Sequence, residues 1–386
     1  MRLEYTCAEY FAGIGLMRMG LEAEGWRVVF ANDISPHKFA MYQGFFPDDS
    51  SHYIVDDIFS LDVRAIPKAT LATCSFPCID LSLAGNMRGL SGGKHSSAFW
   101  GFVRLLHAQR DDAPPILLLE NVNGWLYSNR GEDFRLTILS LNELGYACDV
   151  FTLDALRFMP QSRPRVFVVA TRLPVGEYGY RRLLERPRGL LSERLRATLL
   201  ANKDLRWYAL PLPTLPPLLR EGLSQIVEPL AEDDPRWWSE AETRRHLAMM
   251  SDSHRCYVEW LAQGERIVYR TFYRRRRPDG QRAEVRRDDI AGCLRTAVGG
   301  SGKQFLIRAG QGRIRMRTMT PREYARLQGV PDHMPISLPD TQALTAFGDA
   351  VCVPVVRWIA RYVLAPLVEA LPHPLTPLTL FEDDGG

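Results

Sequence analysis

Four side chains in the first half of the chain have the types that a covalent reaction needs. Cys78 follows the apolar run 69–74 and a proline, and Glu120 ends another apolar run. Arg163 and Arg165 alternate with other residues in an extended segment, so both project to the same side. A thiol can be a nucleophile, a half-buried carboxyl group a general acid, and an arginine a ligand for anions or carbonyl oxygens. A lone cysteine is more often a small buried residue, so the interpretation of Cys78 depends on where the fold brings the other three.

The surrounding elements predict an α/β fold with a doubly wound sheet. Apolar runs typical of strands alternate with helical spacing and end at glycine, proline or polar residues. The predicted strands are 3–11, 27–32, 53–55, 69–74, 116–119, 147–152 and 166–170, and the predicted helices are 14–25, 98–107 and 133–145. Such sheets bind ligands beyond the carboxyl ends of their strands, where the strand order reverses. The four side chains are therefore expected at one edge of the sheet.

The turn after the first strand indicates an adenosine site. Phe11, Gly13 and Gly15 lie in this turn, and Asp33 follows the second strand. Glycines let the backbone approach a ligand, and an acid at this place accepts hydrogen bonds from ribose hydroxyl groups. Arg18 replaces the third glycine of the dinucleotide fingerprint, which favours a nucleotide without pyrophosphate, such as S-adenosylmethionine. A glycine loop that only turns the chain remains the alternative.

Two further loops are candidates for ligand contacts. After the third strand, Asp57 can face an adenine amino group while Ile58 packs on the ring, although an ordinary acidic loop would look the same. Residues 85–97 are rich in glycine, serine and positive charge, with Lys94 among them. This composition suits a mobile lid that reaches phosphates, and a disordered surface loop is the rival interpretation.

Composition and charge exclude several classes of protein. The chain has 386 residues, 46% of them hydrophobic, which predicts two domains or one elaborated domain. No apolar run is long enough to span a membrane and no signal region begins the chain, so a cytosolic protein is expected. The 7 cysteines are scattered and indicate neither a disulfide framework nor a zinc site, and no metal is expected. Net charge is only +3, but residues 265–317 carry 15 Lys and Arg against 5 Asp and Glu, which indicates a nucleic-acid partner.

Taken in order, the motifs resemble those of the bacterial-type DNA cytosine-C5 methyltransferases. The similarity extends from about Tyr5 to Ile359. The matching positions are Phe11-Ala12-Gly13-Ile14-Gly15, Asp33, Asp57-Ile58, Phe76-Pro77-Cys78, Glu120-Asn121-Val122, Gln161, Arg163, Arg165, Leu294-Arg295-Thr296, the two runs 317–323 and 325–329, and Gly348-Asp349-Ala350-Val351. Each motif alone is weak, but the ordered set is specific. The resemblance implies a Rossmann-like, S-adenosylmethionine-dependent methyltransferase fold with a second, smaller target-recognition domain.

The resemblance also implies a role for each matching residue. Cys78 would add to C6 of a flipped-out cytosine, Glu120 would support N3, and Arg165 would hold O2, with Arg163 as a fourth catalytic residue that supports the loop. S-Adenosylmethionine would donate the methyl group and leave as S-adenosyl-L-homocysteine. The implied cofactor residues are Phe11, Gly13, Gly15, Asp33, Ile34, Asp57, Ile58, Pro77, Asp349 and Ala350. The implied DNA contacts are Ser82, Lys94, Ser97, Gln161, Arg274, Arg275, Arg276, Arg277 and Thr296.

The expected domain organisation follows from composition and resemblance together. Residues 1–172 would form the catalytic and cofactor-binding domain, 173–340 the target-recognition domain, 341–368 a segment that returns to the catalytic domain, and 369–386 a disordered tail. The four consecutive arginines 274–277 could contact phosphates or guanine edges, and a solvated charged loop is the alternative. Three tryptophans are expected in the core of the smaller domain: Trp237, Trp238 and Trp260.

Several positions depart from the family's pattern. Ile79 stands where glutamine is common, His95-Ser96 where Arg-Gly is usual, Asp33-Ile34 where Glu-Trp is common, and Asp349 where asparagine is expected. The leading hypothesis is a monomeric, cytoplasmic modification enzyme that acts on double-stranded DNA beside a cognate restriction endonuclease. A tRNA-directed relative is disfavoured by the long basic insert and the missing Cys-Phe-Thr tripeptide. A silent DNA-binding homologue is disfavoured because Cys78, Glu120 and Arg165 are all retained.

Overall fold

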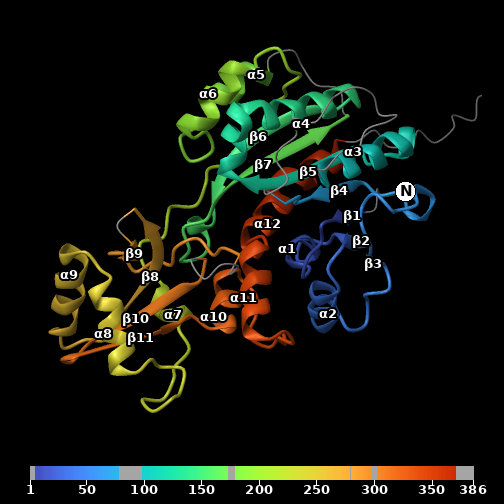
Figure 1. Ribbon diagram of the computed structural model, residues 1–386. Coiled ribbons are helices and arrows are strands. Elements are labelled where there is room, and N and C mark those ends of the chain that lie inside the picture. The colour runs from blue at the N-terminus through green and yellow to red at the C-terminus, as the bar shows by residue number, and fades with distance from the viewer. Residues whose placement is uncertain (1–4, 78–97, 173–178, 279, 297–301, 371–386) are drawn as a thin grey trace, which may run out of the picture.

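A computed structural model describes residues 5–77, 98–172, 179–278, 280–296 and 302–370 of the 386. Figure 1 shows a large sheet with helices on its two faces and, beside it, a smaller sheet that carries helices of its own. The C-terminal helices run between the two. The predicted tail 369–386 lies outside the described residues from position 371 onward.

The large sheet has the predicted doubly wound form. Its strands are β1 (Thr6–Tyr10), β2 (Arg27–Asp33), β3 (Tyr53–Val55), β4 (Leu71–Cys74), β5 (Ile116–Val122), β6 (Ala147–Asp154) and β7 (Pro164–Thr171). Their order is β3-β2-β1-β4-β5-β7-β6, and β7 runs antiparallel to both of its neighbours whereas the other pairs are parallel. The order reverses between β1 and β4, so the crevice beyond these two strands is the expected ligand site.

Short helices connect these strands. They are α1 (Leu16–Glu22), α2 (Pro36–Phe45), α3 (Ala98–Gln109) and α4 (Glu132–Glu143), with 3-10 turns η1 (Val63–Ala65), η3 (Arg110–Asp112), η4 (Asn123–Gly131) and η5 (Ala155–Arg157). Two further helices, α5 (Gly179–Leu184) and α6 (Glu193–Ala201), follow β7. Helix α2 is absent from the helices that the sequence predicts. It begins with a strong local signal, because the Ser35 side chain accepts from Lys38 N at 3.3 Å and a proline follows at the first helical position.

The segment after β7 packs on the large sheet. Leu183, Leu195 and Trp207 are buried in the same cluster as Phe134 of α4. The backbone near Trp207 also continues the sheet, since Cys148 N donates to Arg206 O at 3.1 Å and Tyr208 N donates to Cys148 O at 3.0 Å. The catalytic unit therefore extends well beyond residue 172, which differs from the boundary that the sequence predicts.

The smaller unit is built on an antiparallel sheet. Its strands are β8 (Val268–Arg277), β9 (Gly280–Val285), β10 (Gln304–Gly310) and β11 (Arg313–Thr318), in the order β11-β10-β8-β9, with helices α7 (Leu223–Ile226), α8 (Glu240–Ala248) and α9 (Asp252–Ala262) nearby. One face carries Phe272, Phe305 and Ile307, which form a buried cluster with Val258 of α9. The other face meets the C-terminal helices, because Leu306 shares a cluster with Tyr324.

The three tryptophans of this unit have different environments. Trp237 is buried, and the ring of Trp238 lies 5.3 Å from that of Phe305 and 4.2 Å from that of His246, as expected for core residues. The prediction for Trp260 is wrong, because its side chain is 65% exposed. It lies on α9, whose buried side is formed by Val258, Leu261 and Ala262.

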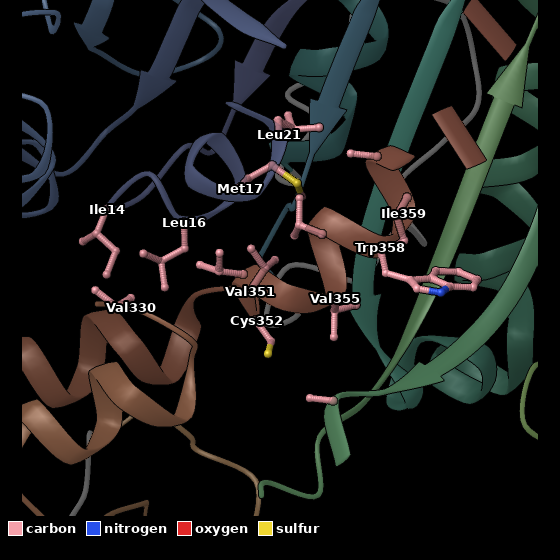
Figure 2. Packing of buried hydrophobic residues seen from close by; sticks show 14 of the residues in the cluster. Ile14, Leu16, Met17, Leu21, Val330, Val351, Cys352, Val355, Trp358 and Ile359 are labelled. Carbon is pink, nitrogen blue, oxygen red and sulfur yellow. The ribbon is translucent and has the colours of Figure 1, made fainter. Parts of the chain in front are cut away.

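The C-terminal helices return to the large sheet. They are α10 (Pro321–Leu327), α11 (Asp340–Asp349), α12 (Val353–Ile359), the π-helical turn η6 (Ala360–Leu364) and α13 (Ala365–Glu369). Figure 2 shows Met17 and Leu21 of α1 packed against α12, with Val355 and Ile359 nearby. The two helices approach closely at Gly20, where an added Cβ would lie 2.6 Å from Val356.

The helical stretch from α12 to α13 is interrupted by the π-helical turn η6. Pro366 has no N–H group for the carbonyl four residues earlier, so the helical hydrogen-bond pattern widens before it. By length and composition alone, the helical stretch Asp340–Glu369 could cross a membrane, but 67% of its most apolar window is buried inside the molecule. Its apolar side chains are used in the core that Figure 2 shows.

Candidate active site

A single cavity of about 900 Å³ lies at the carboxyl ends of β1, β2, β4 and β5. It extends from the glycine turn after β1 to the end of β5. The predicted residues that line it are Phe11, Gly13, Asp33, Ile34, Asp57, Ile58, Pro77, Glu120, Arg165, Thr296, Asp349 and Ala350. Residues as distant in sequence as Phe11 and Ala350 thus line one cavity, which lies beyond the carboxyl ends of the strands, where a ligand site is expected.

The glycine turn is held in place by Asp33. Gly13 N donates to Asp33 Oδ2 at 3.0 Å, and Ser35 N donates to Oδ1 at 2.9 Å. Phe11 and Gly13 both have a positive φ, 59° and 58°, so the backbone curls tightly around the start of the cavity. Each oxygen of the Asp33 carboxylate keeps acceptor capacity for a ligand.

Gly15 has a structural role in this turn. It has φ 82°, and an added Cβ would lie 2.6 Å from the Phe46 ring and 2.7 Å from the Tyr42 ring. Gly15 is not among the residues that line the cavity. The close approach of Phe46 and Tyr42 explains why glycine is required here, and the contact of Gly15 with the cofactor stays a prediction.

Near the glycine turn, the wall of the cavity also carries two isoleucines and an acid. The Ile34 side chain is 65% exposed and lines the cavity, whereas Ile58 is buried over Gly101, which leaves no room for a Cβ there. Asp57 is exposed, and its Oδ1 accepts from Phe59 N at 2.9 Å. Two isoleucines and a carboxylate at one end suit a flat aromatic base with an amino group.

Glu9 is a cavity residue that the sequence analysis missed. It lies on β1, is only 2% exposed, and its Oε2 has no hydrogen-bond partner among the described residues. Burial raises the pKa of Glu9 to about 8, against the opposing attraction of Arg18. The sequence did contain a signal for Glu9: it is a lone acid inside an apolar strand, two residues before Phe11. A buried acid without a partner is costly, so its presence indicates a binding function.

Glu120 and Arg165 form an ion pair at the other end of the cavity. The residue opposite Arg165 on β5 is Val122, so Arg165 and Glu120 are diagonal neighbours on one face of the sheet. Their Nε and Oε1 atoms lie 3.0 Å apart, and both side chains are largely buried. Burial raises the pKa of Glu120, and the attraction of Arg165 and Arg163 only partly offsets this. A carboxyl group that keeps its proton to higher pH than usual can donate to a ring nitrogen.

Cys78 lies outside the described residues, as do Ser82, Lys94 and Ser97. Both residues that flank this segment, Pro77 and Ala98, line the cavity. The end of β4 is also tied to the end of β5, because Asn121 Nδ2 donates to Phe76 O at 3.1 Å. The segment that contains Cys78 thus begins and ends at the cavity that holds Glu120 and Arg165.

Arg163 is 2% exposed and does not line the cavity. Its guanidinium donates to Leu294 O at 2.8 Å, to Gly348 O at 3.0 Å and to Ala350 O at 2.7 Å. It thereby ties β7 to the segments before β10 and after α11. Arg163 is a positioning residue in this structure, with contacts of the kind that support a loop, and its place among the catalytic residues stays a prediction.

Gln161 is fully buried, which corrects the prediction that it contacts DNA. Its Nε2 donates to Leu327 O at 2.9 Å, and its Oε1 accepts from Leu294 N at 3.2 Å. The amide group therefore joins three segments that are distant in sequence. Its interior partners leave it no path to a ligand in this structure.

Asp349 is connected to two segments that are distant from it in sequence. Its Oδ1 accepts from the Thr296 hydroxyl at 2.8 Å, and its Oδ2 lies 3.6 Å from Lys38 Nζ on α2. Lys38, which the sequence analysis did not single out, also lines the cavity. The lysine compensates the charge that aspartate adds at this position. The hydroxyl of Thr296, expected at DNA, is engaged with Asp349.

The four consecutive arginines that end β8 divide between the two faces of the small sheet. Tyr273 points toward the cavity, since its hydroxyl donates to Cys293 O at 2.5 Å and Cys293 lines the cavity. By strand alternation Arg275 and Arg277 share this face, and both pair with Glu284, at 2.9 and 2.5 Å. Arg274 is on the face of the helices, where its guanidinium lies 4.8 Å from the ring of Phe305. Arg276 is exposed on that same face.

Comparisons with known proteins are consistent with this geometry. The chain matches the family described as C-5 cytosine-specific DNA methylase over residues 5–365. The DNA-cytosine methyltransferase of Escherichia coli (strain K12) is 26% identical over 412 residues, covering 94% of this chain and 78% of the relative. The type II methyltransferase M.NlaX of Neisseria lactamica is 26% identical over 374 residues, covering 94% and 97%. The crystal structure of the S. pombe Dnmt2 methyltransferase has a TM-score of 0.57 and 17% identity, covering 96% of this chain and 100% of that one, which shows the fold alone.

Proposed function

Because the chain belongs to the family of C-5 cytosine-specific DNA methylases, we propose that it is the modification enzyme of a type II restriction–modification system. Its reaction is methyl transfer from S-adenosylmethionine to C5 of a cytosine in DNA. One observation carries the assignment to this site: a single cavity joins the glycine turn to the Glu120–Arg165 pair and is bounded by both residues that flank the Cys78 segment. Relatives described as type II methyltransferases support the role beside a cognate endonuclease.

The chain's own residues divide the reaction into steps. The cytosine must leave the duplex, because its C6 and C5 atoms are inaccessible inside the base stack. The Cys78 thiolate adds to C6 while protonated Glu120 donates to N3 and Arg165 binds O2, so that electron density accumulates at C5. S-Adenosylmethionine supplies an electrophilic methyl group to that carbon. Loss of the C5 proton to a base then expels the Cys78 thiolate, and N3 returns its proton to Glu120 as the aromatic ring is restored.

The cavity residues fit S-adenosylmethionine by their chemistry. The Asp33 carboxylate, with acceptor capacity to spare, suits the ribose hydroxyl groups. Ile34 and Ile58 suit the adenine faces, and Asp57 suits its amino group. The unpartnered oxygen of Glu9 suits the ammonium group of the methionine portion, which would complete a buried ion pair. Asp349, held by Thr296 and Lys38, would close the site beside Ala350.

Glu9→Gln is expected to weaken the binding of S-adenosylhomocysteine, which carries the same ammonium group, by about 10- to 100-fold. Glutamine keeps the size of the side chain but loses the charge, and a hydrogen bond to a charged group contributes about 1.5–3 kcal/mol. Isothermal titration calorimetry measures the change. Glu143→Gln is the matched control, because Glu143 is exposed at the end of α4 and does not line the cavity. Equal affinity of Glu9→Gln and wild type would remove Glu9 from the cofactor site.

We assign target recognition to the small sheet with α8 and α9. Arg275 and Arg277 are the leading candidates for DNA contacts, because they share the face of Tyr273 that is turned to the cavity. Ser82, Lys94 and Ser97 are proposed to contact DNA on the strength of the resemblance. Catalysis needs no metal in this scheme, since the thiol, the acid and the arginine supply each step. One asymmetric site suffices, so we expect a monomer that acts in the bacterial cytoplasm.

Replacing Arg275 and Arg277 together with alanine is expected to weaken DNA binding and flatten its salt dependence. If both side chains contact phosphates, the slope of log K against log salt falls by about 2. Fluorescence anisotropy with a labelled duplex at several salt concentrations measures both quantities. Arg276→Ala is the matched control, because Arg276 is exposed on the opposite face of the same strand. Unchanged binding by the double variant would mean that the arginine run is only a solvated surface.

The direct test of the function is bisulfite sequencing of plasmid DNA from cells that express the chain. Cytosines protected in one short motif, and unprotected in a Cys78→Ala control, would establish the reaction, the substrate and the recognition site. Absence of protection with the wild-type chain would refute the assignment and direct attention to tRNA as substrate. Ile79 and Asp349, which depart from the family's pattern, would then be the first residues to exchange.

A further inference from the structure

We propose that Cys293 is a positioning residue whose thiolate balances the two arginines beside Glu120 and thereby keeps Glu120 protonated for catalysis. The inference rests on the proposed role of Glu120 as the proton donor to N3. Cys293 lies in the segment between β9 and β10, lines the catalytic cavity and is partly exposed. It is 173 residues from Glu120 in sequence, and no motif of the chain marks it.

The sulfur of Cys293 lies against both guanidinium groups. Its Sγ atom is 3.6 Å from Arg163 Nη1, 3.7 Å from Arg165 Nη1 and 3.8 Å from Arg165 Nη2. On its other edge Arg165 contacts the Glu120 carboxyl group through Nε at 3.0 Å. The Arg165 guanidinium is therefore held between a carboxyl group and a sulfur atom, so that a change of charge at one is felt at the other.

The backbone around Cys293 is fixed on both sides. The Tyr273 hydroxyl donates to Cys293 O at 2.5 Å. Gly292 N donates to Gln304 Oε1 at 2.7 Å, and Gln304 Nε2 donates to Gly292 O at 2.8 Å. These contacts with β8 and β10 hold the sulfur in place without help from a ligand. The position of Cys293 beside the arginines is thus built into the fold.

The balance of charge explains why a negative sulfur is useful here. The charged and titratable groups that face Cys293 are Arg163, which precedes β7, Arg165 of β7, the nearby Arg295, the neutral hydroxyls of Tyr273 and Tyr324 and, across Arg165, Glu120 of β5. When Glu120 carries the proton that it must donate to N3, the buried arginines have no negative partner among these groups unless Cys293 supplies one. Burial would raise the pKa of Cys293, but the charges of Arg163 and Arg165 outweigh it and lower the pKa.

Cys293 has an alternative partner in its neutral form. Its sulfur lies 3.3 Å from Leu294 O, to which a thiol can donate. The thiolate cannot make this bond and instead accepts from the guanidinium groups of Arg163 and Arg165. Loss of the proton therefore exchanges one neutral hydrogen bond for several charge-assisted ones, and the two arginines then attract Glu120 less strongly. The pKa of Glu120 rises as a result.

The pH dependence of methyl transfer tests this inference. Cys293→Ser keeps the size of the side chain but cannot ionise, so the arginines act on Glu120 without opposition and lower its pKa. The alkaline limb of the rate profile is then expected to move to lower pH. A shift of one pH unit makes the ratio of wild-type to variant rates grow about tenfold between pH 6 and pH 9. Cys293→Asp restores a negative charge and is expected to return the alkaline limb toward that of the wild type.

Two results would overturn the inference. A Cys293→Ser variant whose rate is reduced by the same factor at every pH would show that the side chain only supports the fold. Cys293→Asp with the same alkaline limb as Cys293→Ser would show that charge is irrelevant. The matched control is Cys256→Ser, because Cys256 is exposed on α9 and does not line the cavity.

A second measurement does not depend on methyl transfer. Alkylation of Cys293 by iodoacetamide, followed by mass spectrometry in a Cys78→Ala background, reports the thiolate fraction against pH. A midpoint below that of free cysteine, about 8.5, is expected, and a midpoint above it would refute the thiolate. If the wild-type chain methylates no cytosine, the proposed function fails while this midpoint still decides the state of Cys293.

Discussion

Cys78→Ser is expected to abolish methyl transfer while the protein still binds DNA and S-adenosylmethionine. A serine hydroxyl is not ionised at neutral pH, so addition to C6 is lost and C5 remains too weak a nucleophile to accept a methyl group. We expect a loss of more than about a thousandfold, which is about 4 kcal/mol in activation free energy. Binding should persist because the cofactor-site and arginine residues described above are unchanged.

Transfer of a labelled methyl group to a duplex measures the rate, and anisotropy measures DNA binding. A duplex with fluorine at C5 of the target cytosine adds a direct readout, because fluorine cannot leave as a proton and the cysteine adduct is trapped. The wild type should form this adduct and Cys78→Ser should not. Cys256→Ser, at an exposed cysteine of α9, should behave as wild type. Turnover of Cys78→Ser near the wild-type rate would sink the covalent mechanism.

Glu120→Gln is expected to lower the rate by about 100- to 10,000-fold with little change in cofactor affinity. The carboxamide can still donate a hydrogen bond to N3, but it cannot transfer a proton. The strand order supports the second part, since Glu120 lies on β5 and Asp33 on β2, with β1 and β4 between them. Single-turnover kinetics and calorimetry with S-adenosylhomocysteine separate the two effects.

The pH profile sharpens this prediction. Because burial raises the pKa of Glu120, its protonated form persists above the usual range, and the wild-type rate should fall only as the pH rises through that raised value. Glu120→Gln should lose this alkaline limb, since the carboxamide does not titrate. Glu143→Gln, at an exposed residue that ends α4, is the matched control. An unaltered rate or an unaltered alkaline limb in Glu120→Gln would remove Glu120 from the role of acid.

The sequence by itself was sufficient for the fold class and the family. The strands of the large sheet alternate with helices, and each element can be recognised from its own run of residues. The family match over residues 5–365 confirms the resemblance that the ordered motifs indicated. Glu120 and Arg165 could be singled out from the sequence. Glu120 follows the apolar run 116–119, and Arg165 precedes the apolar run 166–170. These are local properties, since strand propensity, turn residues and side-chain chemistry are all read from neighbouring positions.

Only the tertiary structure decided what those residues contact. Gln161 and Arg163 are both buried, because backbone groups more than 100 residues away complete their hydrogen bonds, and the sequence does not show this. Arg275 and Arg277 face the cavity side while Arg274 does not, because pairing with β9 and β10 sets which face of β8 meets the helices. Cys293 was invisible in sequence for the same reason, and the acid in the first strand gave no indication that its buried oxygen would lack a partner among the described residues. The unpartnered oxygen of Glu9, and the place of Cys293 beside Arg163 and Arg165, exist only once distant strands are brought together.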